Sequence, residues 1–259
     1  MQAVVSRREA KPAASAFRKL TASEFRLFLR EKAAVFWGLA FPLVLLIIFG
    51  SIPAFKKPDK DLGGLTLLQA YVPILLALVL AMLAMQALPT ILSGYRERGV
   101  LRRLATTPVG PARLLGAQLS VYAAVTVVSS ILVLAVARIA YGVPLPSQVA
   151  GFVLAFALGL AALLGIGLII AAVARSQRAA QPIGAILFFP MMFFAGLWLP
   201  IDAMPTALAD ISRYTPLGAT VQALQDASTG QWPHPMQLLV LAGYAIVFAA
   251  AAVKWFRWE

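Results

Sequence analysis

The sequence predicts an all-α integral membrane protein. We expect six membrane-spanning helices, an amphipathic interfacial helix before the first span, and short re-entrant helices on the outer side between spans five and six. Of the 259 residues, 61% are hydrophobic and only 12% are charged, whereas soluble domains carry about 25% charged residues. A water-soluble chain of this size has no interior large enough to bury so much apolar surface.

Six segments reach the length of about 20 mostly apolar residues that is needed to cross a bilayer. They are Ala33–Ile52, Ala70–Ser93, Leu114–Tyr141, Gln148–Ala174, Pro182–Leu199 and Met236–Trp255. No repeat or low-complexity linker divides the chain, so residues 1–259 are expected to form one transmembrane domain. It has an N-terminal segment at 1–32, an inner loop at 94–113 and an outer region at 200–235. The first apolar run is long enough to span, which favours a retained helix over a signal peptide.

Lysine and arginine are unevenly distributed between the two sides of these spans. Seventeen of the 22 fall on the side that holds both termini, and five fall on the other side. Cytoplasmic loops carry the basic excess in membrane proteins, so both termini are expected in the cytoplasm. A net charge of +12 usually suggests nucleic-acid binding. No nucleic-acid partner is expected here, because the basic residues occur in short segments between apolar runs.

The segment Ser15–Lys32 has the pattern of an amphipathic helix that lies on the membrane surface. At 100° per residue its apolar side chains share one face, and its basic side chains share the opposite face. The apolar face holds Phe17, Leu20, Phe25 and Phe28, and the basic face holds Lys19, Arg26 and Arg30. Glu24 falls on the apolar side and interrupts the pattern. The alternative is a merely basic flank that follows the topology rule.

The predicted spans lack the groups that an ion-driven transporter needs. Besides Lys254 at the inner end of the last span, Arg138 is their only Asp, Glu, His, Lys or Arg. Such transporters place carboxylates or histidines in their spans to bind the driving ion, although backbone carbonyls can also bind sodium. An ion-coupled transporter is therefore the second hypothesis, and an assembly factor without transport activity is the third. With no cysteine, one histidine (His234) and no G-x-x-x-x-G-K-[ST] loop, no metal, catalytic or ATP site is expected in this chain.

The inner loop after the second predicted span combines basic and apolar residues at helical spacing. Leu101 and Leu104 are three residues apart, and Arg98 and Arg102 are four apart, so each pair is expected on its own face. Pro108 is expected to end this helix. The pattern, with Glu97 among the arginines, suits a surface that docks a cytoplasmic partner. The alternative is a basic loop that only sets topology.

Two further segments suggest specialised structure. Prolines at 200, 205 and 216 divide the outer region into short, moderately apolar pieces, which fit helices that dip partway into the membrane. The fifth predicted span is rich in phenylalanine and methionine, which indicates lipid-facing packing or a path for a large apolar substrate. Pro42, Pro89 and Pro190 lie inside spans, where proline kinks a helix and frees a carbonyl.

Four stretches resemble the type 2 ATP-binding-cassette exporter permeases, a family that includes daunorubicin-resistance-like drug exporters and lipid or polysaccharide exporters. The stretches are Phe41–Gly50, Tyr95–Pro108 (Tyr-Arg-Glu-Arg-Gly-Val-Leu-Arg-Arg-Leu-Ala-Thr-Thr-Pro), Gly196–Asp202 (Gly-Leu-Trp-Leu-Pro-Ile-Asp) and Tyr214–Thr220 (Tyr-Thr-Pro-Leu-Gly-Ala-Thr). Tyr95–Pro108 is the most specific of the four. The resemblance covers nearly the whole chain.

The resemblance implies a permease subunit that works as a dimer, a homodimer or a heterodimer, in a bacterial plasma membrane. Each copy would rest on a separate soluble ATPase subunit, which binds ATP and Mg. It further implies that the inner loop is the ATPase-coupling helix, with the residues Arg96, Glu97, Arg98, Leu101, Arg102, Arg103 and Leu104. Substrate would pass near spans two and five, where the expected lining residues are Met82, Met85, Phe189, Met192 and Phe193. Whether the exported substrate is drug-like, a lipid or a glycan is left open.

Overall fold

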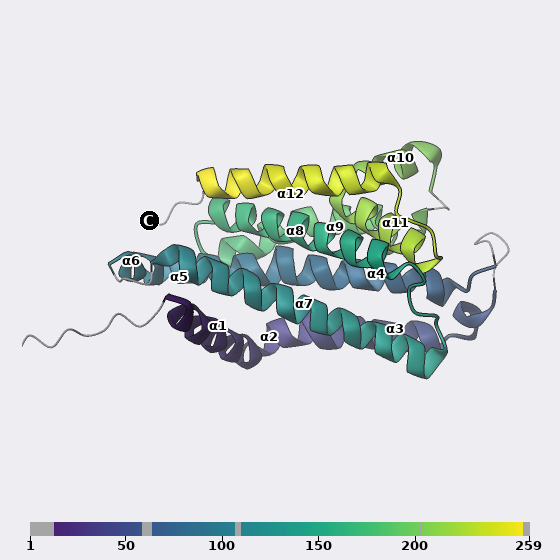
Figure 1. The fold of residues 1–259 in the computed structure, drawn as a ribbon, viewed down its shortest axis with the longest axis horizontal. Coiled ribbons are helices and arrows are strands. Elements are labelled where there is room, and N and C mark those ends of the chain that lie inside the picture. The colour runs from purple at the N-terminus through teal and green to yellow at the C-terminus, as the bar shows by residue number, and fades with distance from the viewer. Residues whose placement is uncertain (1–12, 59–63, 107–109, 202–203, 256–259) are drawn as a thin grey trace, which may run out of the picture.

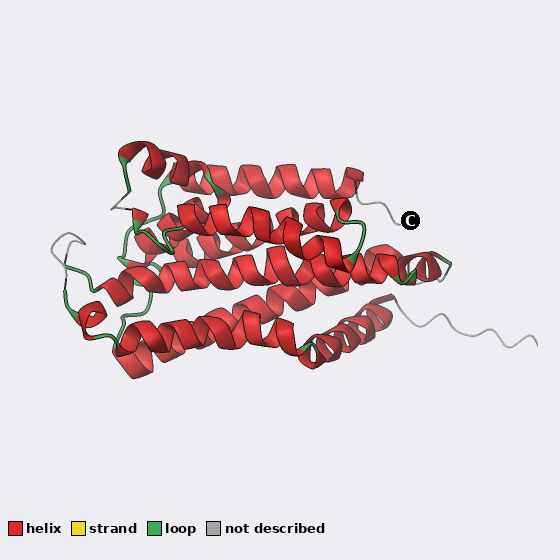
Figure 2. Cartoon of the chain, turned by 180° about the vertical axis from the view of Figure 1, so that it is seen from behind, coloured by secondary structure: helices red, strands yellow, loops and turns green. Residues whose placement is uncertain are grey.

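A computed structural model describes residues 13–58, 64–106, 110–201 and 204–255. Over these residues the chain is an elongated bundle of helices, and no strand is present (Figures 1 and 2). Five helical segments are long and apolar enough to cross a membrane, which confirms the all-α membrane fold. They are Lys32–Ser51, Leu67–Glu97, Ala112–Tyr141, Val149–Val173 and Pro235–Ala252.

The first two of these segments are composite, and the last three are continuous helices. Lys32–Ser51 consists of α2 (Lys32–Val35), η1 (Phe36–Ala40) and α3 (Phe41–Ser51), followed by η2 (Pro53–Lys56). Leu67–Glu97 consists of α4 (Leu67–Ala81), η3 (Met82–Ala87) and α5 (Leu88–Glu97). The continuous helices are α7 (Pro111–Tyr141), α8 (Val149–Val173) and α12 (Pro235–Trp255).

The fifth predicted span, Pro182–Leu199, corresponds to helix α9 (Gln177–Phe194). Gln177, Arg178 and Gln181 lie in its first two turns and lower its mean hydropathy, so α9 is not among the five segments that qualify by composition. It nevertheless packs against α5, η3 and α8 within the bundle. Five of the six predicted spans are therefore confirmed, and a crossing by α9 stays a prediction.

The segment α4–η3–α5 forms the centre of the bundle. Of its most apolar window 78% is buried, compared with 11% for α12. Helix α4 is apolar on all sides, as expected for a helix that is surrounded by other helices. It begins with a capping box in which Thr66 Oγ1 accepts a hydrogen bond from Gln69 N at 3.2 Å and Gln69 Oε1 accepts one from Thr66 N at 2.8 Å.

Both composite segments contain a π-helical stretch immediately before a proline. Pro42 is the second residue of α3, which follows η1. Pro89 is the second residue of α5, which follows η3. Proline has no N–H, so the carbonyl four residues earlier loses its helical donor and the turn widens. At Gly38, four residues before Pro42, the hydroxyl of Ser129 on α7 donates a hydrogen bond to that carbonyl at 2.7 Å. The predicted kinks at Pro42 and Pro89 thus take the form of π-helical turns.

Two glycines allow neighbouring helices to approach the wide turn of η3. A Cβ on Gly167 of α8 would collide with the carbonyl oxygen of Ala84, and a Cβ on Gly184 of α9 would lie 2.5 Å from that of Met85. Real Cβ atoms do not come so close to a carbonyl oxygen. Backbone therefore packs directly on backbone here, as small residues permit between membrane helices.

The outer region contains the expected short helices, α10 (Thr206–Tyr214) and α11 (Pro216–Ser228). Pro205 precedes α10 and Pro216 begins α11, where a missing N–H costs nothing. Most of α11 is buried, in contact with α4, α8, α9 and α12. Gly159 of α8 adjoins Thr220 of α11, so the small residue at position 159 allows α11 of the same chain to pack closely on α8.

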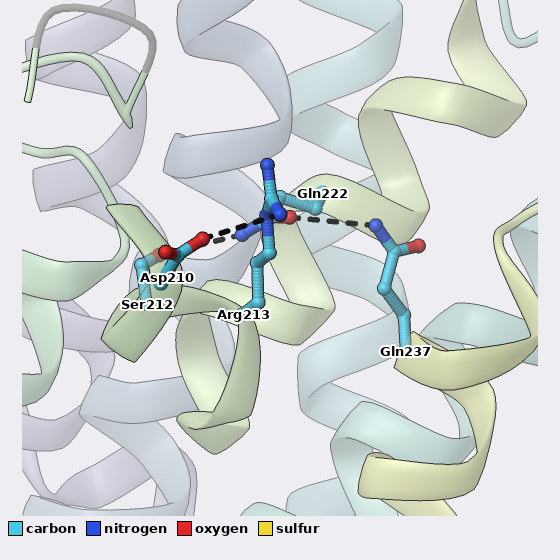
Figure 3. Close-up of polar contacts among 5 residues, drawn as sticks. All are labelled: Asp210, Ser212, Arg213, Gln222 and Gln237. Atoms are coloured by element: carbon cyan, nitrogen blue, oxygen red, sulfur yellow. Dashed lines mark hydrogen bonds and ion pairs between the residues drawn. The ribbon is translucent and has the colours of Figure 1, made fainter. Parts of the chain in front are cut away.

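A polar network joins the four helices α9, α10, α11 and α12 (Figure 3). The buried hydroxyl of Ser212 on α10 donates to Phe194 O at the end of α9 (2.6 Å). Gln222 Nε2 on α11 donates to Ser212 Oγ (3.4 Å), and Gln237 Nε2 on α12 donates to Gln222 Oε1 (3.5 Å). These bonds hold α10 and α11 against the bundle.

Candidate functional site

Helix α1 (Ala13–Arg30), helix α6 (Val100–Ala105) and the C-terminal end of α12 lie at the same end of the bundle (Figure 1). We call this the basic end, because the described parts of the arginine-rich inner loops gather there. Helices α10 and α11 lie at the opposite end. The N-terminal residues 1–12, Pro108 and the aromatic residues 256 and 258 fall outside the described part of the chain.

The loop Tyr95–Pro108 contains a helix, but the helix begins later than its spacing suggests. Helix α5 continues to Glu97, and Gly99 then adopts a left-handed conformation with φ of 67°. This residue ends α5 and lets the chain turn into α6. Arg98 lies in the break between the helices, so the expectation that Arg98 and Arg102 share one helical face is corrected.

Helix α6 has an inward apolar side and an outward basic side. Leu101 is 2% exposed, and Leu104 packs against the same apolar core. Arg102 and Arg103 are exposed on the outside of α6. The two leucines therefore anchor the helix to its own chain. Both arginines stay exposed, and Arg103 Nη2 donates to Arg98 O at 3.4 Å.

Arg96 binds the end of another membrane helix. Its guanidinium donates to the carbonyl oxygens of Ala171 (2.8 Å) and Ala172 (3.3 Å) and to that of Ala174. These residues form the C-terminus of α8, where the last carbonyls have no helical donor and a positive charge is favourable. Arg96 therefore acts as a cap for α8 supplied from α5.

Glu97 makes the complementary contact on the next helix. Its Oε2 accepts a hydrogen bond of 3.0 Å from the backbone N–H of Gln177, the first residue of α9. The first N–H groups of a helix lack partners, and a carboxylate is favourable beside them. Arg96 and Glu97 thus bind the two ends of the α8–α9 connection.

Arg98 connects the same region to the N-terminal helix. It lies over the ring of Tyr95, with 5.7 Å between the guanidinium carbon and the ring centroid. The Tyr95 hydroxyl donates to Glu24 Oε2 at 2.6 Å, and Gln118 Nε2 on α7 donates to the same oxygen at 2.5 Å. A polar cluster therefore holds α1, α5 and α7 together.

The burial of Glu24 explains why it interrupts the apolar face of α1. Glu24 is 7% exposed and shares a face with Leu20 and Phe28, and Phe28 packs edge-on against Tyr122 of α7. This face contacts the protein, through Tyr95, Gln118 and Tyr122. Burial raises the pKa of Glu24, and the hydrogen bond from Tyr95 lowers it by a smaller amount.

A groove of about 570 Å³ opens between three helical segments near the basic end. One wall comes from α2 and η1, the second from η3 and α5, and the third from α9. Its polar lining residues are Glu31, Gln86, Thr90, Gln177 and Gln181. Its aromatic lining residues are Trp37, Phe188 and Phe189. Among the residues that the structure describes, no basic side chain lines the groove, and it offers both hydrogen-bonding groups and aromatic surface.

Of the five residues expected along the substrate path, two line the groove and three do not. Met82 and Phe189 line the groove. Met85 and Met192 are completely buried, and Phe193 is partly exposed and packs on Phe194. Gln86 and Gln181 also line the groove and were not among the expected residues, although an amide within or beside an apolar span is a visible signal for a polar lining.

Comparison with known proteins identifies the family. Residues 15–228 match the family described as "ABC-2 type transporter". The chain belongs to this family.

The match runs from α1 to the end of α11, so it includes α6, the groove and the polar network. The inner membrane transport permease YhhJ of Escherichia coli K12 is 27% identical over 171 residues, which are 63% of this chain and 46% of that protein. The protein of the same name from Shigella flexneri gives the same values. The chain therefore spans about half the length of the curated relatives that it matches.

Proposed function

We propose that this chain is the membrane-spanning permease subunit of an ATP-driven exporter. The observation that carries the proposal is the family match over residues 15–228, which includes the separate helix α6 at the basic end. A topology signal needs only positive charge. A helix whose two leucines pack against its own chain and whose two arginines are exposed also suits a docking surface.

The partner that we propose for α6 is a soluble ATPase subunit, which binds ATP and Mg itself. Arg102 and Arg103 would meet acidic groups or carbonyls on that subunit, because both side chains are exposed. Leu101 and Leu104 would hold the angle at which α6 is presented. The loop thus divides into residues that face the partner and residues that face this chain.

The substrate path that we propose is the groove between η1, η3 and α9. Its amides and aromatic rings suit an amphiphilic molecule, which fits a drug-like compound, a lipid or a glycolipid better than a bare anion, since no cation lines it. A second copy, identical or similar, would close the open side of the groove. Two permeases and two ATPases would form the working unit.

The proposed location is a bacterial inner membrane, with the basic end in the cytoplasm. The printed name of the Escherichia coli relative places that protein in the inner membrane. The basic excess at the end with α1 and α6 supports the orientation through the positive-inside rule.

The proposal is tested by reconstitution in vesicles with a soluble ATPase subunit, for which the product of the neighbouring gene is the first candidate. We expect ATP-dependent substrate movement, and a complex of two permeases with two ATPases by native mass spectrometry. The double variant Arg102→Asp/Arg103→Asp should weaken ATPase binding at least about tenfold. Arg213→Asp, which reverses an exposed charge at the opposite end, is the matched control. Transport driven by an ion gradient without any ATPase would refute the proposal.

A further inference from the structure

We infer that Arg96 and Glu97 join α5 to α9, so that two walls of the groove move as one body and the groove opens against the third wall, α2–η1. The inference rests on the proposed function for its consequence in transport. Its structural basis is independent of that function. It assigns Arg96 and Glu97 as positioning residues within this chain and not as contacts to the ATPase.

The first tie lies at the basic end of the groove. Arg96 holds the carbonyls of Ala171, Ala172 and Ala174, and Glu97 holds the first N–H of α9. Their partners are backbone groups, which cannot swing away from the helices that carry them. Hydrogen bonds with one charged partner are also stronger than neutral ones. The end of α5 is therefore fixed to both sides of the α8–α9 connection.

A second tie lies further along the same pair of helices. Gly184 of α9 packs on the carbonyl of Met85 in η3, where a Cβ would be 2.5 Å from the oxygen. At Gly94 of α5, a Cβ would be 2.9 Å from Oε1 of Gln177. Helix α9 and the segment η3–α5 thus touch at two levels. At Gly184 the contact is with backbone, which leaves little room for relative motion, and at Gly94 it is with the Gln177 side chain.

The third wall is attached differently. Between η1 and η3, Gly38 faces the side chain of Leu83, so the contact involves a side chain that can change its rotamer. Trp37 of η1 is 46% exposed. A push on α6 would therefore carry α5 and α9 together and shift them relative to α2–η1.

The experiment uses the absence of cysteine to place pairs of spin labels at exposed positions. One pair, Thr106 and Arg178, reports the distance from α6 to α9. The other pair, Thr106 and Lys32, reports the distance from α6 to the first span. With the ATPase bound, we expect ATP to change the second distance and to leave the first unchanged. A first distance that changes as much as the second would overturn the inference.

Variants of Glu97 distinguish two roles of this side chain: capping the N-terminus of α9 and contacting the ATPase. The amide oxygen of Glu97→Gln can still accept from Gln177 N–H, whereas Glu97→Ala cannot. We expect Glu97→Ala to broaden the Thr106–Arg178 distance distribution and to reduce protection of the Gln177 amide from hydrogen exchange roughly fivefold, the factor expected for one hydrogen bond. In Glu97→Gln we expect the distance distribution and the amide protection to be as in the wild type. The matched control is Arg102→Gln, which removes a charge from an exposed side chain of α6 and should leave both readouts unchanged.

The Thr106–Arg178 distance distribution and the Gln177 amide protection can be measured without the ATPase. They therefore test the link between α5 and α9 separately from the proposed function. If no ATPase binds the chain, the proposed function fails while the distances still test the link. With the ATPase present, Glu97→Ala should hydrolyse ATP but move less substrate per ATP, and Glu97→Gln should behave like the wild type. Equal loss in Glu97→Gln and Glu97→Ala, or no change in either, would overturn the inference.

Discussion

Glu24 is a buried carboxylate on a helix that otherwise looks built for a membrane surface. Tyr95 and Gln118 each donate a hydrogen bond to it, and these three residues come from α1, α5 and α7. Burying a carboxylate is costly unless its oxygens are paired, so the cluster favours one position of α1 on the bundle. Arg98, stacked on Tyr95, connects this position to the start of α6.

Replacing Glu24 with leucine should loosen α1. The Tyr95 hydroxyl and the Gln118 amide would lose their acceptor in a buried site, which typically costs about 1–3 kcal/mol. We expect a lower melting temperature in detergent and faster trypsin cleavage within α1. The control is Ser23→Leu, at an exposed position on the same helix. Equal stability of Glu24→Leu and wild type would contradict the role of the cluster.

The raised pKa of Glu24 predicts a pH dependence of the same contact. Because burial raises this pKa, the folded state holds the proton more tightly than the unfolded state. The contribution of protonated Glu24 to the free energy of unfolding is therefore complete below the ordinary glutamate pKa. It decreases as the pH rises from there through the raised pKa. We expect Glu24→Gln, which imitates the protonated form, to match the wild-type melting temperature near pH 4 and to exceed it near pH 8. A difference that is the same at both pH values would contradict this assignment.

The roles of Arg96 and Glu97 could not be read from the sequence. Both residues stand at the end of an apolar span among other charges, where an outward-facing role is the natural expectation. Their partners lie about 75 to 80 residues further along the chain and are backbone groups, which leave no pattern in the sequence. The neighbouring Leu101 and Leu104 were predictable, since apolar residues at helical spacing are expected to face the protein.

At the scale of elements, the spans were predictable because apolar length alone defines them. The prediction Ala70–Ser93 corresponds to Leu67–Glu97, and Gln148–Ala174 corresponds to Val149–Val173. The division of the inner loop was missed although Gly99 carries the signal, a glycine between two helical patterns. The π-helical form of the turns at Pro42 and Pro89 depends on neighbouring helices, so proline alone predicts only a kink.

Substitutions at the glycines beside η3 test how tightly this turn is packed. Gly167→Ala and Gly184→Ala each place a methyl group against a carbonyl oxygen of η3. Because the obstacle is backbone and cannot rotate away, we expect each to cost about 1–3 kcal/mol in thermal or denaturant unfolding. Gly243→Ala on α12 has open space around it and is the control. It should be neutral or slightly stabilising, since alanine favours helix. Neutral behaviour of all three would contradict the close approach.

For the whole molecule, the proposed function requires that the basic end face the cytoplasm. Helix α6 can meet a cytoplasmic ATPase only if this end faces the cytoplasm. We expect a single cysteine at Arg178 to resist an impermeant thiol reagent in intact cells and one at Thr229 to react with it. Both positions are exposed on the protein, so access depends on the side of the membrane. Labelling of position 178 in intact cells would reverse the topology.

The central claim is that α6 is the surface through which a separate ATPase drives this permease. It is tested most directly by a photo-crosslinking residue at position 102, in membranes that contain the candidate ATPase subunit. A second probe at Thr229, at the opposite end of the bundle, is the control. The account predicts an adduct with the mass of one permease plus one ATPase from position 102 and none from position 229. No adduct from position 102, or capture of the ATPase at position 229, would contradict it.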